Sequence, residues 1–269
     1  MRAYIQGVGC AAAGIANWET AGDLLAGRSP YVPGALPAMS PELLPPAERR
    51  RAGLLIRLAL TVAHQAVSGA RIAPTDLATV FASADGDGET MHLICLALAA
   101  PTVEISPTRF HNSVQNAPSG YWSIATRSHA PSSTANGRDT VFSIALLEAM
   151  VQVQVERRDV LLVCYDVPMP EPLYSHHPIG SSCAVALFLG VEPVAGTLAR
   201  IDVARVPGRP QDVTTMTDPA LEGLRTANPA ARALPLLGYI ATRKSGRLGF
   251  DLDPFAMLQV DVNASPGSY

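Results

Sequence analysis

Charged residues are scarce in this chain of 269 residues, because Asp, Glu, Lys and Arg together make up only 16% of it. An average soluble protein carries about 25%. The 20 basic and 23 acidic side chains leave a formal net charge of −3. A disordered chain would be more highly charged, and a nucleic-acid-binding protein would normally carry a basic surplus to neutralise phosphates. The composition therefore argues against both classes and favours a folded chain with a substantial core.

Long apolar runs are also missing. Residues 54–67 form one of the most apolar stretches, but Arg57, Thr61, His64 and Gln65 interrupt it. A membrane-spanning helix needs roughly 18 continuous apolar residues, and a signal peptide needs an apolar segment that the N-terminus does not contain. We therefore expect no membrane span and a cytoplasmic location.

Paired cysteines are absent. Cys10, Cys95, Cys164 and Cys183 are widely spaced and form no CxxC motif, so neither a zinc site nor a redox motif has support. Cys164 lies within an apolar run and Cys183 begins another, which predicts small buried side chains in a reducing compartment. We expect no metal and no cofactor.

Apolar runs typical of strands alternate with stretches that have helical spacing. We expect strands at 3–9, 77–83, 160–165, 183–189, 200–206 and 257–262, and helices at 17–25, 47–68, 91–99, 121–126, 137–155, 219–226 and 230–239. The proline-rich residues 29–46 predict an irregular loop inside one domain. This alternation favours an α/β fold with helices on both faces of a sheet.

The neighbouring runs 183–189 and 200–206 could pair as an antiparallel hairpin, which would make the sheet mixed. We expect residues 1–206 to form the main domain. Residues 207–269 would be a C-terminal extension packed on that domain, ending in a loose tail at 265–269.

Two glycine-containing motifs have both a ligand interpretation and a structural one. Gly7-Val-Gly9-Cys-Ala-Ala12 follows a strand and fits the GxGxxA dinucleotide fingerprint, but the next helix begins late and no acidic residue is placed for the ribose. Asp85-Gly-Asp87-Gly-Glu89 resembles part of a calcium loop without its later ligands. Acidic residues at the positive end of a helix explain that turn equally well.

Candidate catalytic side chains occur at two other places. His176 and His177 lie in a polar loop with prolines, which favours surface residues because adjacent histidines cannot easily bind one metal ion. Ser132, Ser133 and Thr134 precede a helix, and a loop that caps this helix explains them. Acyl transfer by one of these three hydroxyls stays as an alternative, although no GxSxG motif is present.

The most unusual stretch is residues 109–126, RFHNSVQNAPSGYWSIAT, where polar side chains stand beside Phe110, Tyr121 and Trp122. Such a mixture suits an interface or a ligand pocket, and equally a capped helix with a well-filled core. The pattern FHNSVQNAPSGYWSIAT resembles the N-terminal half of β-ketoacyl synthases. It most resembles the short chain-length factors of aryl-polyene and xanthomonadin-type pigment pathways. Gly7-Val-Gly9, the helix at 47–68 and Leu146-Leu-Glu-Ala149 support this resemblance, which covers roughly residues 1–206.

The resemblance implies a thiolase-like half-fold, layered αβα with a mixed sheet. It also shows what is missing. The family's nucleophilic cysteine begins a buried helix, whose dipole favours the thiolate. Here Gly137, Arg138 and Asp139 stand in that region, either as a buried ion pair or simply as the start of the helix. The family's two catalytic histidines belong to the second half, and none of the six histidines of this chain lies in residues 207–269.

The resemblance therefore implies a non-catalytic subunit that forms a heterodimer with a complete ketosynthase. An acyl carrier protein would deliver the growing chain through that partner. The residues expected to border the partner's acyl tunnel are Phe110, His111, Asn112, Gln115, Asn116 and Tyr121. Bulky side chains there would stop chain growth, because overpacking an apolar tunnel is unfavourable.

Overall fold

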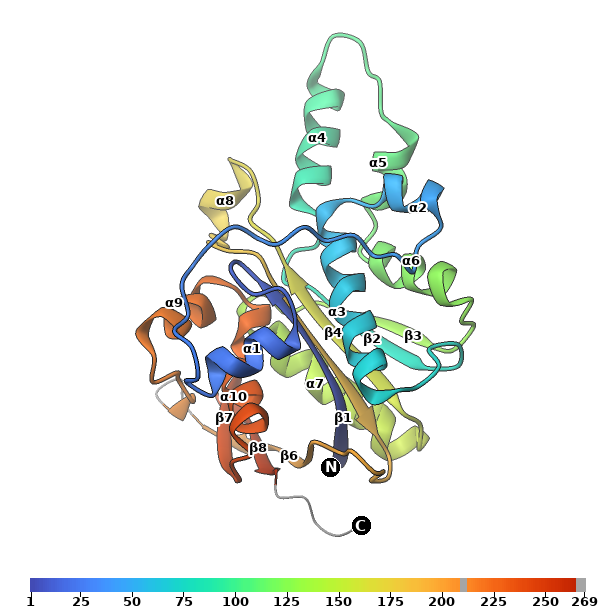
Figure 1. Ribbon diagram of the computed structural model, residues 1–269. Coiled ribbons are helices and arrows are strands. Elements are labelled where there is room, and N and C mark those ends of the chain that lie inside the picture. The colour runs from blue at the N-terminus through green and yellow to red at the C-terminus, as the bar shows by residue number, and fades with distance from the viewer. Residues whose placement is uncertain (209–211, 265–269) are drawn as a thin grey trace.

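The computed structural model describes residues 1–208 and 212–264, and within them one mixed sheet of eight strands runs in the order β3-β2-β4-β5-β1-β6-β8-β7 (Figure 1). The strands are β1 (Arg2–Ala12), β2 (Ala78–Ala82), β3 (Ser132–Ala135), β4 (Val160–Asp166), β5 (Cys183–Gly190), β6 (Ala199–Pro207), β7 (Gly246–Asp253) and β8 (Ala256–Asn263). Strand β2 runs parallel to both of its neighbours, β3 and β4. The other neighbouring strands pair antiparallel. The α/β fold class and the mixed sheet are confirmed.

The helices are α1 (Trp18–Leu25), α2 (Pro46–Arg51), α3 (Leu54–Ala70), α4 (Gly88–Ala99), α5 (Pro107–Asn112), α6 (Ala117–Thr126), α7 (Val141–Val151), α8 (Leu173–His176), α9 (Pro219–Ala227) and α10 (Leu234–Thr242). One core cluster lies between the sheet, α3 and α6, and the other includes α7 and α10. Strand β4 shows why both faces are apolar. Leu161 and Val163 belong to the first cluster, while Leu162 and Cys164 belong to the second.

The single helix expected at 47–68 is broken into α2 and α3. Ala52 is extended, with φ −66° and ψ 120°, and α3 begins after Gly53. The break lets the end of α2 reach α5, where the Asn112 side-chain amide donates to the Arg51 carbonyl oxygen at 2.9 Å. The two helices therefore serve different neighbours: α3 covers the sheet and α2 supports α5.

The hairpin expected between 183–189 and 200–206 is wrong. Strands β5 and β6 lie on opposite sides of β1, so that Tyr4 pairs with both Gly190 and Arg200. The long, buried β1 occupies the place between them, and the connecting residues 191–198 cross its end. Residues 132–135, expected to be a loop, form strand β3 beside β2.

The C-terminal residues continue the same sheet. Strand β8 pairs with β6 along its whole length, from Asn263 opposite Arg200 to Ala256 opposite Pro207. Strand β7 follows beside β8 at the edge. The tail expected at 265–269 lies outside the described residues.

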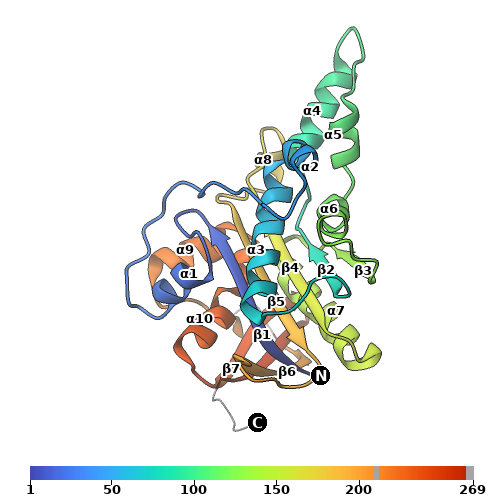
Figure 2. The ribbon, with the colours of Figure 1, turned by 45° about the vertical axis from the view of Figure 1, so that its right-hand side comes forward.

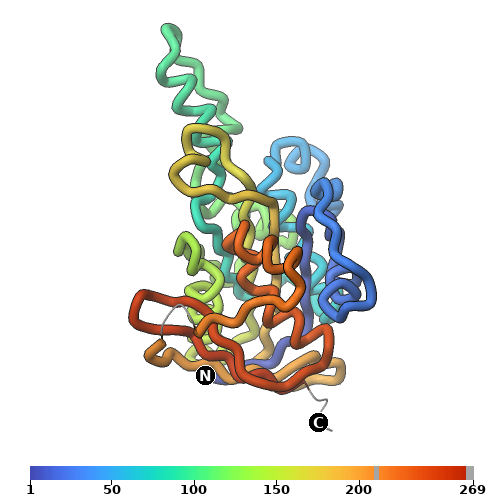
Figure 3. The backbone as a smooth tube through the Cα atoms, turned by 90° about the vertical axis from the view of Figure 1, so that its left-hand side faces the viewer, coloured from blue at the N-terminus to red at the C-terminus, as the bar shows by residue number. Residues whose placement is uncertain are grey.

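Helices α4 and α5 and their connection form an arm that stands clear of the layers (Figures 2 and 3). Within α4 only Gly88 and Ile94 are buried, whereas Met91, Leu96 and Leu98 are each about half exposed. The arm therefore presents apolar surface that nothing in the described part of the chain covers. No helix within 1–208 and 212–264 has both the length and the hydropathy to cross a bilayer.

Candidate functional site

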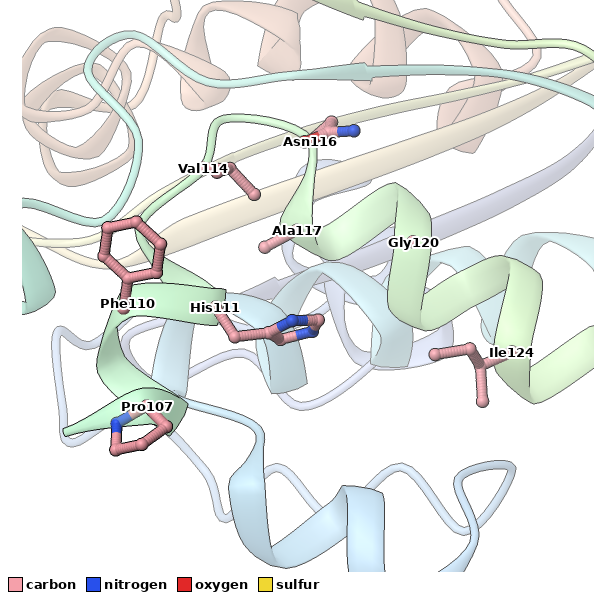
Figure 4. A pocket seen from close by; sticks show the side chains of 8 residues that line it. All are labelled: Pro107, Phe110, His111, Val114, Asn116, Ala117, Gly120 and Ile124. Atoms are coloured by element: carbon pink, nitrogen blue, oxygen red, sulfur yellow. The ribbon is translucent and has the colours of Figure 1, made fainter.

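The segment singled out by the sequence forms an open apolar groove of about 440 Å³ across α5 and α6 (Figure 4). Its lining is Pro107, Phe110, His111, Val114, Asn116, Ala117, Gly120 and Ile124. Phe110 is 67% exposed and Val114 is 53% exposed, so two large apolar side chains of the groove face solvent. Of the six expected tunnel residues, Phe110, His111 and Asn116 lie in this groove.

Two other expected tunnel residues lie beneath the groove. Asn112 and Tyr121 are buried, and the Tyr121 hydroxyl donates to Asn112 Oδ1 at 3.1 Å. The amide of Asn112 also donates to Arg51, while the ring of Tyr121 meets that of His111 edge to face. Asn112 and Tyr121 therefore connect α2, α5 and α6, and the ring of Tyr121 packs against His111.

Gln115, the sixth expected tunnel residue, lies on the other side of the turn between α5 and α6. It lines a second cavity of about 300 Å³ that is more polar than the groove. Asp85, Asp87, Gly88, Met91, Ser113, Arg138, Met169, Leu173, His176 and His177 complete the lining. Successive residues of one short turn thus serve two different cavities.

The expectation that both adjacent histidines lie on the surface is wrong for His177. His177 is 8% exposed, and its Nδ1 forms a hydrogen bond with the carboxylate of Asp85. Nε2 of the same ring lies 3.6 Å from Oδ1 of Asp139. His176 is exposed. Asp85 is 92 residues away in the chain, so no local pattern could have indicated this pair.

Residues 137–140, where the resemblance implies that the family has its nucleophile, form a turn. Helix α7 begins at Val141, after a single 3₁₀ turn over Arg138–Thr140 that follows Gly137. Arg138 and Asp139 are exposed, and the arginine donates to the His176 carbonyl oxygen at 3.5 Å. Asp139 faces His177 and Arg232, so the interpretation of Arg138 and Asp139 as a buried ion pair is wrong.

The thiols of this chain do not provide a nucleophile at that turn. Cys10, Cys164 and Cys183 are buried in the sheet, and burial raises the pKa of each, that of Cys10 to about 12. The fourth cysteine, Cys95, is exposed on the arm. The three buried thiols stay protonated at neutral pH and lack the nucleophilic thiolate form.

The three hydroxyls considered for acyl transfer lie in strand β3. Ser132 accepts a hydrogen bond from the Thr79 hydroxyl at 2.8 Å. Ser133 accepts from Gln152 at 3.0 Å and donates to Glu148 at 3.4 Å. Ser132 and Ser133 are therefore bonded into the sheet and the helix behind it, and Thr134 lies in the same strand.

The glycines of the GxGxxA match face helix α3. A Cβ atom added to Gly9 would overlap the carbonyl oxygen of Val62, and one added to Gly7 would overlap that of Ala66. Strand β1 continues to Ala12, so no helix begins where the fingerprint requires its phosphate-binding turn. These glycines allow a close approach of strand and helix, and the geometry gives the dinucleotide alternative no support.

The acidic turn after β2 caps α4. Asp87 accepts from the backbone N–H of Thr90 at 2.9 Å and from its hydroxyl at 2.8 Å. Within the described ranges, no group of three or more His, Cys, Asp or Glu side chains could hold a metal ion. The structural interpretation of this turn therefore agrees with the geometry.

A buried carboxyl behind the polar cavity was not indicated by the sequence. Asp166, at the end of β4, is 1% exposed. Its Oδ1 accepts from the Ser83 hydroxyl and from the Ala84 N–H, both at 2.8 Å. Oδ2 is buried with no partner among the described residues. Burial outweighs these hydrogen bonds and raises the pKa of the carboxyl from 3.8 to about 7.

This raised pKa predicts a stability that falls as the pH increases from about 4 to above 7. Over that interval the folded chain holds a proton on Asp166 that the unfolded chain has lost. Asp166→Asn should remove this dependence and stabilise the chain at pH 8.5 by on the order of 2–4 kcal/mol. At pH 5 the two proteins should agree within about 1 kcal/mol. Urea unfolding at both pH values measures the difference, and parallel pH profiles would contradict the assignment.

Comparison with family models matches residues 25–241 to the beta-ketoacyl synthase, N-terminal domain. The chain belongs to this family. A search of curated proteins finds no match. In this β-ketoacyl synthase N-terminal-domain protein, the residues before α7 are Gly137, Arg138 and Asp139. The groove is formed by the same segment that carries the sequence resemblance.

Solved structures share the fold along almost the whole chain. One is the ketosynthase ApeO in complex with its chain length factor ApeC from Xenorhabdus doucetiae, with 20% identity, a TM-score of 0.73 and coverage of 97% of this chain and 99% of the matched chain. The ishigamide ketosynthase/chain length factor matches with 13% identity and a TM-score of 0.71, covering 98% and 99%.

A third is the AntDE:AntF complex of a type II polyketide synthase acyl-carrier protein with its hexaketide-bound ketosynthase. It matches with 10% identity and a TM-score of 0.77, covering 98% of this chain and 99% of the matched chain. At these identities the likeness establishes the fold, which is the thiolase-like N-terminal half-fold of ketosynthases.

Proposed function

We propose that this chain is a chain-length factor, a non-catalytic subunit that pairs with a complete β-ketoacyl synthase and shapes its acyl tunnel. The reaction served would be chain elongation in polyene, polyketide or fatty-acid-type synthesis, with aryl-polyene or xanthomonadin-type pigments as the closest product class. The observation that carries this proposal is the exposed apolar groove around Phe110, in a ketosynthase-like chain whose α7 begins without a cysteine.

The exposed apolar surface supports an interface with a partner. Beyond Phe110 and Val114, the arm and its base expose Leu96 at 54%, Leu98 at 56% and Val103 at 56%. Exposed apolar side chains that gather along a groove often mark a protein interface. Within the described residues, strand β3 forms one edge of the sheet, and an unpaired edge can accept another chain.

Of the six residues predicted to border the tunnel, the three that line the groove would form the gate that limits chain length. Phe110, His111 and Asn116 line the groove, while Asn112 and Tyr121 hold them in place and Gln115 faces the other cavity. The catalytic cysteine and histidines would come from the partner, and the acyl carrier protein would dock on that partner. Residues 1–206 would form the ketosynthase-like unit, with the later strands β8 and β7 extending its sheet.

The test is co-expression with the ketosynthase encoded nearest to this chain, with an affinity tag on this chain alone. We expect a stable heteromeric complex, and condensation of acyl and malonyl thioesters only when both subunits are present. Each subunit purified alone is the control. A well-folded chain that captures no ketosynthase, or a ketosynthase that is equally active without it, would contradict the proposal.

A further inference from the structure

The arm is attached to the rest of the fold at two places. At the end of α5, Asn112 is buried and bonded to Arg51 and Tyr121. At the start of α4, the turn Ser83–Asp87 lies against the end of β4, where it is bonded to Asp166. We propose that a proton bound to Asp166 keeps this second attachment closed, so that the base of the arm opens more readily as the pH rises. This device needs no partner subunit and does not depend on the chain-length-factor proposal.

Asp166 is the residue to which the turn is bonded. Its Oδ1 accepts from the Ser83 hydroxyl and the Ala84 N–H, and the Ser83 oxygen accepts in turn from the Gly86 N–H at 2.9 Å. The backbone carbonyl oxygen of Asp166 accepts from the side-chain amide of Asn228 at 3.0 Å. One buried residue therefore joins the base of the arm to the C-terminal extension.

The second carboxyl oxygen makes this attachment depend on protonation. Oδ2 is buried with no partner among residues 1–208 and 212–264, so a negative charge there would lack both solvent and a hydrogen-bond donor. Of the charged groups that act on the carboxyl, Asp85 opposes its ionisation and His177 favours it. Its other titratable neighbours are uncharged at neutral pH because burial raises the pKa of each, and they are Cys164, Tyr165 and Cys183.

The carboxyl can become hydrated only where the surrounding structure opens. Strand β4 is paired with β2 on one side and with β5 on the other, and Asn228 is fully buried. The turn after β2 instead leads into α4, in which only Gly88 and Ile94 are buried and which stands clear of the layers (Figures 2 and 3). Segments with few buried contacts open at the lowest free energy. The turn Ser83–Asp87 is therefore the part that moves, and the arm moves with it.

The direction of the pH dependence follows from proton linkage. When the turn is open, the carboxyl of Asp166 is hydrated and has its ordinary pKa of 3.8, whereas in the closed state burial raises its pKa to about 7. Between these two values the open state has released a proton that the closed state retains, so a rising pH favours opening. The ratio of open to closed molecules should increase roughly tenfold per pH unit between about pH 5 and 7 and should level off at higher pH.

The experiment is residue-resolved hydrogen exchange of the purified chain over this pH range. The N–H groups of Ala84 and Gly86 report on the turn, because Asp166 and Ser83 accept from them. Their protection, corrected for the base catalysis of exchange itself, should fall roughly tenfold per pH unit. The N–H groups of β4 should be protected more strongly, and only their protection should weaken in dilute urea, because local opening exposes little surface.

Asp166→Asn should make the protection of both reporter amides independent of pH to within about twofold, because the ionisable group is gone. Asp159→Asn, the same change at the exposed aspartate that precedes β4, is the matched control and should keep the wild-type slope. Ser83→Ala provides a second variant in case the asparagine disturbs the fold. It removes one hydrogen bond to the turn and should lower the protection of Ala84 about fivefold at pH 5.

Three outcomes would overturn the proposal. The first is a protection of the reporter amides that does not change with pH in the wild type, and the second is a slope that persists in Asp166→Asn. The third is exchange of Ala84 and Gly86 with the same protection and urea dependence as β4, which would mean that the turn opens only when the whole chain unfolds. Because the measurement uses the chain alone, a failure here leaves the co-expression result unaffected, and the reverse also holds.

Discussion

Phe110→Asp is expected to abolish capture of the ketosynthase partner. Phe110 is 67% exposed at the groove on which the proposed interface is centred. Aromatic side chains of this kind often dominate the energy of an interface, and a buried, unpaired carboxylate is strongly unfavourable. We expect the affinity to fall by more than ~100-fold, which corresponds to roughly 2.7 kcal/mol. Co-purification followed by titration of the separate subunits measures this.

Phe255→Asp is the matched control for that variant. Phe255 is 83% exposed in the turn between β7 and β8, at the opposite end of the sheet from β3. It should leave the complex intact. Phe110→Ala should retain enough of the interface for assembly and, if Phe110 is the gate, should lengthen the product. Normal capture by Phe110→Asp would place the interface elsewhere.

Gly9→Ala is expected to destabilise the folded chain severely. The added methyl group would overlap the Val62 carbonyl oxygen, and a carbonyl of the backbone cannot rotate away as a side chain does. Relief requires α3 to move away from β1, which separates the buried surfaces of Val62, Ala63 and Ala66 from the sheet. Overpacking of a core typically costs about 1–3 kcal/mol, and displacement of a whole helix costs more. Urea unfolding, or loss of the chain from the folded fraction, reports the effect.

Gly22→Ala is the control for this substitution. Gly22 lies in α1, and nothing lies within 4 Å of the Cβ that alanine would add. Alanine is the better helix former by about 1 kcal/mol, so this variant should be as stable as the wild type or more so. Equal stability of Gly9→Ala and the wild type would show that β1 and α3 are not in close contact. It would also reopen the phosphate-binding interpretation of these glycines.

Local patterns were enough to place most of the elements. The apolar run at 160–165 became β4, and Asn17 caps α1 by accepting from the backbone N–H of Thr20 at 2.9 Å. The prolines within residues 30–45 keep that segment free of helix and strand, because they fix φ and lack a donor. Three of the predicted tunnel residues, Phe110, His111 and Asn116, line a groove, and their role at an interface or tunnel stays a prediction.

The rest required contacts between distant parts of the chain. Asn112 and Tyr121 belong to the same mixture of polar and aromatic residues as the groove residues, but both are buried and hydrogen-bonded to each other. The pairing of His177 with Asp85 depends on the loops after β2 and β4 meeting above the sheet.

The sequence by itself determined an α/β chain with a ketosynthase-like segment and no cysteine before α7, since residue identity and local spacing require no partner. Only the tertiary structure decided that β1 separates β5 from β6, which side chains line the groove, and that Gln115 faces a different cavity from its neighbour Asn116. Those features arise from packing, which selects among arrangements that local patterns leave equally possible.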